Sequence, residues 1–158
     1  MNEAHRKELL RFLLLKTAPV RSGVKPAELL RVRHCYRRRV VAGLPVCLYR
    51  DDILRILKLE YLELLEDDGS SLVLFFHRET LAATLRHPSH RYILARCGYP
   101  AGAGIDDQLA ALRRRFGESG LPHEVGIFIG YPAKDVVGFM RNLPATPVHR
   151  GDWRVFGQ

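Results

Sequence analysis

Residues 121–142, LPHEVGIFIGYPAKDVVGFMRN, are the stretch that decides the predicted fold. Within it, residues 125–129 (VGIFI) form a continuous apolar run of strand length, which is typical of a strand covered on both faces. Gly130 can turn the chain sharply where this run ends, and Pro132 suits the first position of a following helix. Apolar residues then recur at helical spacing over 133–140. The stretch therefore predicts a buried strand, a tight turn and an amphipathic helix.

Other parts of the chain carry patterns of the same two kinds. Residues 72–76 (LVLFF) are a second apolar run of strand length, bounded by turn-forming residues, and predict a central strand. Apolar residues recur at helical spacing over 3–16 and 106–116. A long helix is also predicted over residues 51–66, with an aspartate as its N-cap.

Two shorter strands complete the predicted sheet. Residues 28–34 alternate apolar and basic side chains, which favours a strand, although Pro26 and Glu28 would also suit the start of a helix. A last short strand is predicted over residues 152–156. Because strands alternate with helices, we expect an α/β fold, a single domain over residues 1–158 with a mixed or parallel sheet of about four strands flanked by helices.

Composition limits the class of protein. The chain has 158 residues, of which 47% are apolar, and this suits one globular domain. The apolar residues 9–15 are interrupted by Arg11, and they lack both the length of a membrane helix and a signal-peptide cleavage site. We therefore expect a cytoplasmic protein with no membrane partner. Three widely spaced cysteines without a C-x-x-C pair favour reduced thiols over disulfides or structural zinc.

The carboxyl end of the 125–129 strand is where a ligand is first expected. In open α/β sheets, ligands bind beyond strand ends and against helix N-termini. Gly130, Tyr131 and Lys134 would lie there, and Lys25 could contribute from its glycine-containing loop. A lysine in the first helical turn opposes the helix dipole, which makes sense if an anion binds nearby. Against this, neither phosphate-binding glycine motif is present, and a tight turn alone would explain the Gly-Tyr-Pro sequence.

His123 and Glu124 are secondary candidates, as an acid–base pair. In an extended strand, the eight residues from His123 to Tyr131 span about 26 Å, at roughly 3.3 Å per residue. The pair would then lie at the opposite end of the strand from the turn, and the two could not share one site. Pairing of Glu124 with one of the many arginines is the simpler interpretation.

The net charge of +8 allows an anionic partner such as nucleic acid, although a genome rich in G and C would also produce an arginine-rich chain. Alternating arginines on a strand would present one charged face, which could bind phosphates. A solvated edge strand that resists aggregation would have the same pattern. This basic strip consists of Arg31, Arg33, Arg37, Arg38 and Arg39.

The remaining motifs are weak. His87 and His90 have H-x-x-H spacing, but Pro88 places them in a loop without an acidic residue or cysteine nearby, so no metal site is predicted. Cys97, next to a second Gly-Tyr-Pro sequence, is the thiol to test for reactivity. No pattern identifies a cofactor or a reaction, and the sequence leaves open whether the protein is an enzyme and which oligomeric state it has.

HEVGIFIGYPAKDVVGFMRN, residues 123–142, resembles the HEIGIFLGYPLEDVxGFI signature of an uncharacterised bacterial family, domain of unknown function 3793. Residues 18–30 resemble the family's APxxxGxKPAxL element, and residues 151–156 resemble its GxWKVY element. Members often carry a cysteine before the Ala-Pro pair, where this chain has Thr17. Members also often continue past the tryptophan strand into another helix, whereas this sequence ends at Gln158. The resemblance implies kinship and adds no reaction.

Two hypotheses follow from the sequence. The first is a small cytoplasmic α/β domain that binds a small anionic ligand at the turn formed by Gly130, Tyr131 and Lys134. The alternative is a nucleic-acid or protein-interaction module that uses the basic strip.

Overall fold

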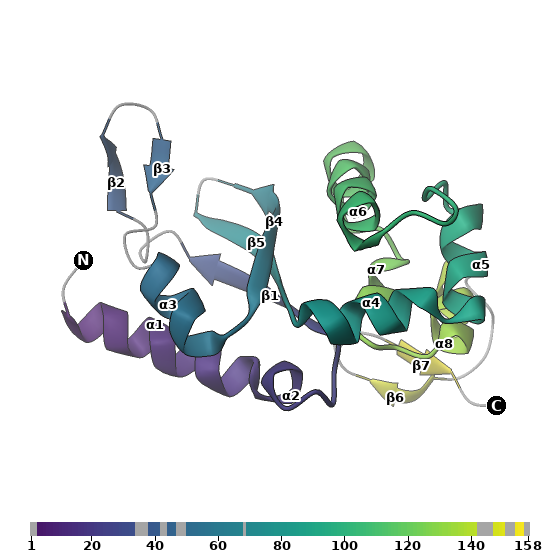
Figure 1. Ribbon diagram of the computed structural model, residues 1–158, viewed down its shortest axis with the longest axis horizontal. Helices are drawn as coiled ribbons and strands as arrows, with labels where there is room; N and C mark the ends of the chain where they lie inside the picture. The colour runs from purple at the N-terminus through teal and green to yellow at the C-terminus, as the bar shows by residue number, and fades with distance from the viewer. Residues whose placement is uncertain are drawn as a thin grey trace. The chain divides into compact units, whose positions relative to one another are not determined.

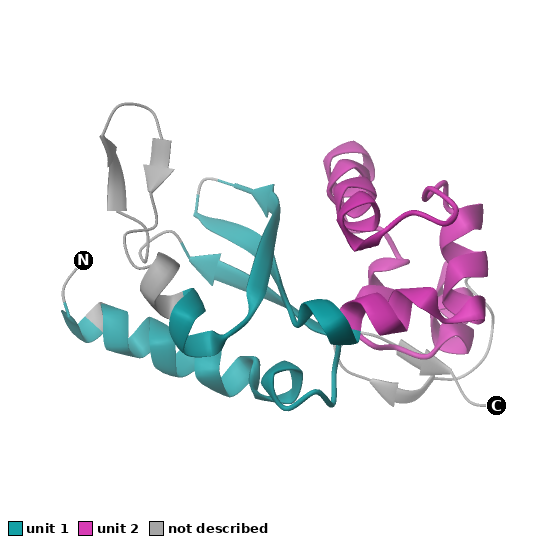
Figure 2. Cartoon of the chain, viewed as in Figure 1, with its two compact units in different colours: residues 1–80 teal, residues 81–158 magenta. Residues whose placement is uncertain are grey.

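The computed structural model describes residues 3–33, 38–41, 44–46, 50–67, 69–141, 147–150 and 154–156, with side chains over 3–33 (except His5), 54–67 and 69–141. The chain forms two compact units, Met1–Thr80 and Leu81–Gln158, which Figure 2 colours separately. Each unit is described by itself. A single domain over residues 1–158 stays a prediction.

The first unit contains a three-stranded antiparallel sheet with the strand order β1-β5-β4 (Figure 1). β1 spans Ala27–Arg33, β4 spans Glu60–Glu66 and β5 spans Ser70–Phe76. β5 lies in the centre, and its Leu74 is paired with Leu29 of β1. The central strand predicted from the LVLFF run is therefore confirmed, and so is the strand predicted near residues 28–34.

Three helices flank this sheet: α1 (Glu3–Lys16), α2 (Ala18–Arg21) and α3 (Arg50–Leu57). Their apolar side chains pack with alternate residues of β5, as expected for a pleated strand that buries a face against helices. The shared hydrophobic core consists of Leu9, Leu13, Val20, Leu30, Leu57, Leu59, Val73 and Phe75. Two further strands, β2 (Arg38–Val41) and β3 (Leu44–Val46), pair with each other as a separate antiparallel ladder.

The long helix predicted over residues 51–66 is wrong. α3 ends at Leu57, and Lys58 adopts a φ of 55°, which is left-handed and stops a helix. The chain then continues as β4, because pairing with β5 satisfies its backbone. A bulge between Glu63 and Leu65 shifts the pairing register by one residue. The strand can therefore accommodate apolar residues that are spaced as in a helix.

The second unit is mainly helical. α4 (Arg78–Arg86), in which the division between the units falls, is followed by α5 (Pro88–Arg96), α6 (Ile105–Ser119), α7 (Val125–Phe128) and α8 (Ala133–Met140). β6 (Pro147–Arg150) and β7 (Arg154–Phe156) form a two-stranded antiparallel ladder. Buried side chains of α5, α6 and α7, among them Leu94, Leu112, Phe116 and Phe128, make up much of this unit's core.

The strand predicted over residues 125–129 is also wrong. These residues form α7 and its C-cap Ile129, and the amide of Ile129 donates to the carbonyl of Val125 over 3.2 Å. All five residues are buried, and a short apolar run that is enclosed on every side has the same pattern in a helix as in a strand. The sheet is therefore neither mixed nor parallel, and it has three strands in the described part of the chain instead of about four. The short turn between β4 and β5 requires the antiparallel arrangement.

Candidate functional site

The turn at residues 130–134 connects α7 to α8. Gly130 adopts a φ of 96°, a conformation that residues with a side chain rarely adopt. The amide of Tyr131 donates to the carbonyl of Gly126 over 2.9 Å, which folds the turn back onto α7. Gly130 and Lys134 are exposed, whereas Tyr131 is half-buried. The tight turn expected at the Gly-Tyr-Pro sequence is therefore present.

α8 begins without a side-chain cap. Pro132 is its N-cap, and the carbonyl of Pro132 accepts from the amides of Asp135 and Val136, at 3.0 and 3.2 Å. The amides of Ala133 and Lys134 lie before these donors, at the positions where a helix has no partner within itself. The exposed ammonium group of Lys134 adds a positive charge to the positive end of the helix.

Asp135 is a buried acid in this turn that the sequence analysis did not single out. Its side chain is 3% exposed, and its Oδ1 has no hydrogen-bond partner in the described part of the chain. An acid at the third helical position commonly accepts from the amide of the N-cap residue, but Pro132 has no N–H to donate. In the sequence, an acidic residue three positions after a proline N-cap could have indicated that this carboxylate lacks its usual backbone partner.

Glu124 belongs to a buried polar cluster. Its side chain is 1% exposed, and its Oε1 accepts hydrogen bonds from Arg115 Nε of α6 and, over 3.1 Å, from the hydroxyl of Tyr99. The Tyr99 ring also packs against Phe128, with 5.9 Å between ring centroids. The cluster thus joins α6 and the segment after α5 to the start of α7. The expected pairing of Glu124 with an arginine is confirmed, and Arg115 is the partner.

The buried Glu124 carboxylate shifts the titration of three neighbours. Its hydrogen bond raises the pKa of the Arg115 guanidinium, so this cation keeps its charge. Burial and the nearby Glu124 charge raise the pKa of the Tyr99 hydroxyl, which remains a protonated donor. Burial and the same charge raise the pKa of the Cys97 thiol. Reactive thiols have lowered pKa values, so the environment of Cys97 disfavours a nucleophilic role.

His123 and Glu124 are adjacent in the chain but differ in burial. His123 is exposed, and its ring meets the ring of Phe139 edge-on, with 4.7 Å between centroids and an interplanar angle of 70°. The separation of about 26 Å from His123 to Tyr131 assumed an extended strand, so it does not apply to a helical segment, where the rise is roughly 1.5 Å per residue. The two residues therefore differ in environment, because the Glu124 carboxylate is enclosed and the His123 ring is exposed.

Lys25 lies in the first unit, in the loop before β1. Its Nζ forms an ion pair with Glu28 Oε2 at 2.9 Å, and both side chains are partly buried. Gly23, two residues earlier, is exposed and adopts a φ of 80°. The charge of Lys25 is therefore compensated within its own unit.

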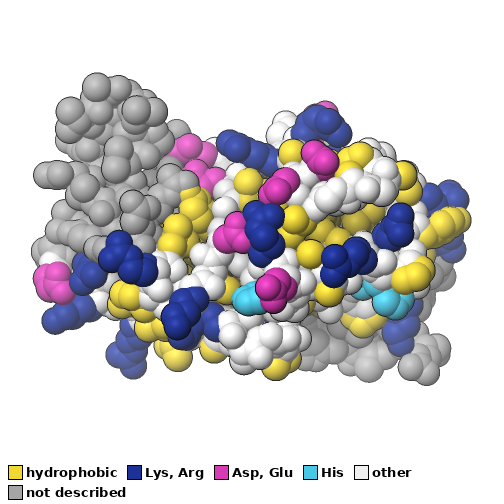
Figure 3. Space-filling model, viewed as in Figure 1, with side chains coloured by type: hydrophobic (Ala, Val, Ile, Leu, Met, Phe, Trp, Pro, Cys, Tyr) yellow, Lys and Arg dark blue, Asp and Glu magenta, His cyan; other side chains and the backbone are white. Residues whose placement is uncertain are grey.

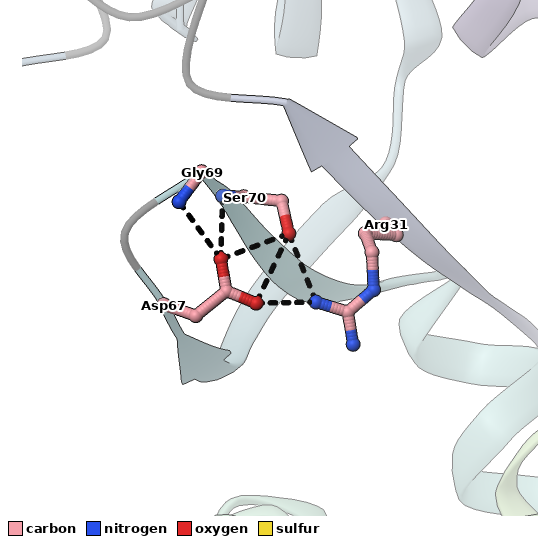
Figure 4. Close-up of polar contacts among 4 residues, drawn as sticks. All are labelled: Arg31, Asp67, Gly69 and Ser70. Carbon is pink, nitrogen blue, oxygen red and sulfur yellow. Dashed lines mark hydrogen bonds and ion pairs between the residues drawn. The ribbon is translucent and has the colours of Figure 1, made fainter.

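Arg31, the first residue of the basic strip, is held by the β4–β5 turn (Figure 4). Its Nη1 donates to Asp67 Oδ2 and to Ser70 Oγ, both over 2.9 Å. Asp67 Oδ1 accepts from the amides of Gly69 and Ser70, at 3.0 and 2.7 Å. These two backbone hydrogen bonds are the main cause that lowers the pKa of Asp67, and Arg31 acts in the same direction.

The rest of the basic strip is described in part. Arg33 is exposed, Arg37 lies outside the described residues, and only the backbone of Arg38 and Arg39 is described, within β2. On the face drawn in Figure 3, Lys and Arg side chains are spread over the described surface and mixed with acidic ones.

His87 and His90, the H-x-x-H pair, each form a local hydrogen bond around the start of α5. His87 Nδ1 accepts from the amide of Ser89 over 3.3 Å, and His90 Nδ1 donates to the carbonyl of Thr84 over 2.7 Å. No group of three or more potential metal ligands occurs among the described residues. Cys97 is half-buried, and the other two cysteines lie outside the described residues.

Comparison with known proteins identifies a family. Residues 13–158 match the model of a family described as Protein of unknown function (DUF3793). No curated protein and no solved structure matches the chain. Within the described ranges, no helix has the length and apolar character needed to span a bilayer. Because the family model covers most of the chain, as the resemblance led us to expect, this protein belongs to the DUF3793 family.

Proposed function

We propose that this protein binds a small anionic ligand at the turn between α7 and α8. The observation that carries the proposal is the start of α8, where no side chain caps the helix and Lys134 is exposed. A helix start of this kind offers backbone N–H donors and a favourable dipole to phosphate or carboxylate groups. Gly130, at the same turn, is exposed and carries no side chain.

The charges of the turn restrict the charge of the ligand that can bind there. Lys134 and the helix dipole attract an anion, whereas the Asp135 carboxylate in the same helical turn opposes one. A compact ligand with a single phosphate or carboxylate group fits this balance better than a polyphosphate. Tyr131, half-buried at the turn, is the side chain placed to contact the body of such a ligand.

Thermal-shift measurements on the full chain with inorganic phosphate, sugar phosphates, small carboxylates and nucleotides test this proposal. A ligand that binds the folded state raises the melting temperature. Lys134→Ala removes the cation, and Ala133→Pro removes one N–H at a position where proline suits a helix. Both variants should lose most of the shift. Arg141→Ala, which removes an exposed cation after the other end of α8, should keep it.

The same experiment contains the result that rejects the placement. If Lys134→Ala and Ala133→Pro fold normally and keep the full ligand-induced shift, the anion binds elsewhere. The compound that gives the largest shift also tests the restriction imposed by Asp135, since a polyphosphate should give a smaller shift than a monophosphate.

The alternative, a nucleic-acid or protein-interaction module that uses the basic strip, predicts a different result. Retention on DNA or RNA should then fall steeply with salt and be lost when Arg37, Arg38 and Arg39 are neutralised together. Arg31 adds little support to this alternative, because Asp67 compensates its charge. Salt-dependent retention without any shift by small anions would replace our proposal with this alternative.

A further inference from the structure

The second unit contains a cavity of about 350 Å³ that is distinct from the turn before α8. Its walls come from α5, from the loop around residues 100–102, and from Gln108 in the first turns of α6. Sites for small molecules span roughly 300–1,000 Å³ and combine apolar walls with a few polar groups. The cavity is therefore large enough for a small organic molecule, and its polar groups indicate which kind.

Gln108 holds one wall of this cavity in place. Its Nε2 donates to the carbonyl of Pro100 over 3.0 Å. Because a carbonyl can only accept, this contact fixes which end of the amide is the NH₂ group. The other end, Oε1, is buried and has no hydrogen-bond partner in the described part of the chain. Because this oxygen has almost no accessible surface, a ligand in the cavity does not contact it, and Gln108 acts by holding Pro100 in place.

Arg91 provides a positive charge at the cavity. It lines the cavity and is exposed, and none of the ion pairs among the described residues involves it. A guanidinium that is not already paired can bind a carboxylate through two parallel hydrogen bonds. The neighbouring arginine, Arg96, is already engaged, because its Nη1 donates to the Tyr92 hydroxyl over 3.2 Å and its guanidinium lies 5.7 Å from the centre of the Tyr92 ring.

The remaining walls are apolar or aromatic. Leu94, Ala95 and Pro100 contribute aliphatic surface, and the largely exposed ring of Tyr92 contributes a flat face. Such walls suit a planar ring, because aromatic faces pack well against aliphatic and aromatic surfaces.

The loop that lines the cavity is held in place by hydrogen bonds before it and within it. Before it, the amide of Tyr99 donates to the carbonyl of Leu94 over 3.0 Å, and the Tyr99 hydroxyl is bonded to the buried Glu124. Within it, Pro100 accepts from Gln108, and Gly102 adopts a φ of 67°, which favours glycine. The cavity is therefore formed before any ligand arrives, which lowers the entropic cost of binding.

We propose that this cavity binds a small ring-containing carboxylic acid. Arg91 pairs with the carboxylate, and the apolar wall with Tyr92 holds the ring. This site is separate from the anion site proposed at α8, and either proposal can fail without the other.

A series of indole compounds tests the two contacts on the native full chain. Indole-3-acetate has the ring and the carboxylate, and its titration into ¹⁵N-labelled protein should shift amide signals of α5, residues 100–102 and Gln108. Tryptamine, which replaces the carboxylate with an ammonium group, should give no shifts at these residues.

Variants separate the role of Arg91 from a general effect of charge. Arg91→Gln should weaken indole-3-acetate binding about tenfold and leave binding of the neutral indole-3-acetamide unchanged. Arg114→Gln removes an exposed arginine of α6 that does not line the cavity, so it should bind both compounds like the native chain.

Several results would overturn this inference. They are equal binding of tryptamine and indole-3-acetate, and failure of indole-3-acetate to shift cavity signals at about 10 mM, beyond the range of even weak specific sites. Shifts confined to the amides of Ala133 and Lys134 would support the anion site at α8 and reject the cavity.

Discussion

Two apolar runs of this chain look alike in the sequence and fold differently. Residues 70–76 form the central strand β5, whereas residues 125–129 form α7 and its cap. Both runs are buried, with Leu74 and Phe128 each 0% exposed. The backbone of β5 is paired with strands on its two sides, while residues 125–129 bond to carbonyls a few positions earlier in the chain. The apolar composition of each run thus explains why it is buried. Whether its backbone hydrogen-bonds to neighbouring strands or to nearby residues explains why it is a strand or a helix.

Each run is preceded by a carboxylate that organises it. Asp67 holds the turn into β5 and remains exposed, with 59% of its side-chain surface open to solvent. Glu124 stands directly before α7, is 1% exposed, and connects α6 and Tyr99 to the start of that helix. The two runs therefore allow two matched tests. One compares their apolar packing, and the other compares the carboxylate anchors before them, Asp67 (exposed) and Glu124 (buried).

The largest effect is expected from apolar truncation in either run. Phe128→Ala should lower the free energy of unfolding by about 3–5 kcal/mol and Leu74→Ala by about 2–5 kcal/mol, because each leaves a cavity in a closed core. Chemical denaturation of the full chain measures both losses. Leu121→Ala, at a side chain that is 54% exposed, is the control and should cost much less. A loss under about 1 kcal/mol for Phe128→Ala would mean that α7 is not part of a packed core.

The second largest effect is expected at Glu124, the buried anchor. Glu124→Gln should lower the free energy of unfolding by about 2–3 kcal/mol, because it removes the negative partner of Arg115 from an enclosed site. Breaking a fully buried pair costs about 3–5 kcal/mol, and Arg115 is 32% exposed, so water offsets part of the loss.

A double-mutant cycle with Arg115→Met isolates the Glu124–Arg115 pair. The combined variant should be less destabilised than the sum of the two single variants, because neither charge is then left alone. Additive losses would show that the two side chains act independently, which the hydrogen bond between them argues against.

The sequence predicted those elements in which local signals agree with the tertiary environment. Helical spacing over residues 3–16 and the turn before the LVLFF run gave a helix and a strand at those places. The two wrongly predicted elements, at residues 60–66 and 125–129, lie where apolar spacing suits either conformation and only distant backbone partners choose between them.

The candidate sites show the same limit. The left-handed turn at Gly130 follows from residue type, so it was predictable. The choice of Arg115 as the partner of Glu124, among many arginines, depends on how α6 packs against α7. The cavity is made by Arg91, Pro100 and Gln108, which lie on separate segments and carry no common motif. Such sites follow from the arrangement of elements in space, which the spacing of residues does not encode.

The smallest effect is expected at the exposed anchor, and it should depend on pH. Backbone hydrogen bonds hold the pKa of Asp67 in the folded protein below the ordinary value of 3.8. A lowered pKa means that ionised Asp67 contributes stability above the unfolded-state pKa, and that this contribution is lost as pH falls through the folded-state pKa. Asp67→Asn, which keeps an acceptor for the turn but removes the charge opposite Arg31, should therefore be slightly less stable than the native chain at neutral pH.

Denaturation of the native chain and Asp67→Asn at neutral pH and at about pH 2.5 measures this difference, which should shrink in acid as native Asp67 becomes protonated. Glu118→Gln, at an exposed acid of α6, is the control and should track the native chain at both pH values. A difference that persists in acid would assign the effect to turn geometry instead of charge. Asp67→Asn and Glu124→Gln exchange the same functional groups beside an arginine, so the ratio of their effects measures how much burial strengthens a carboxylate anchor in this fold.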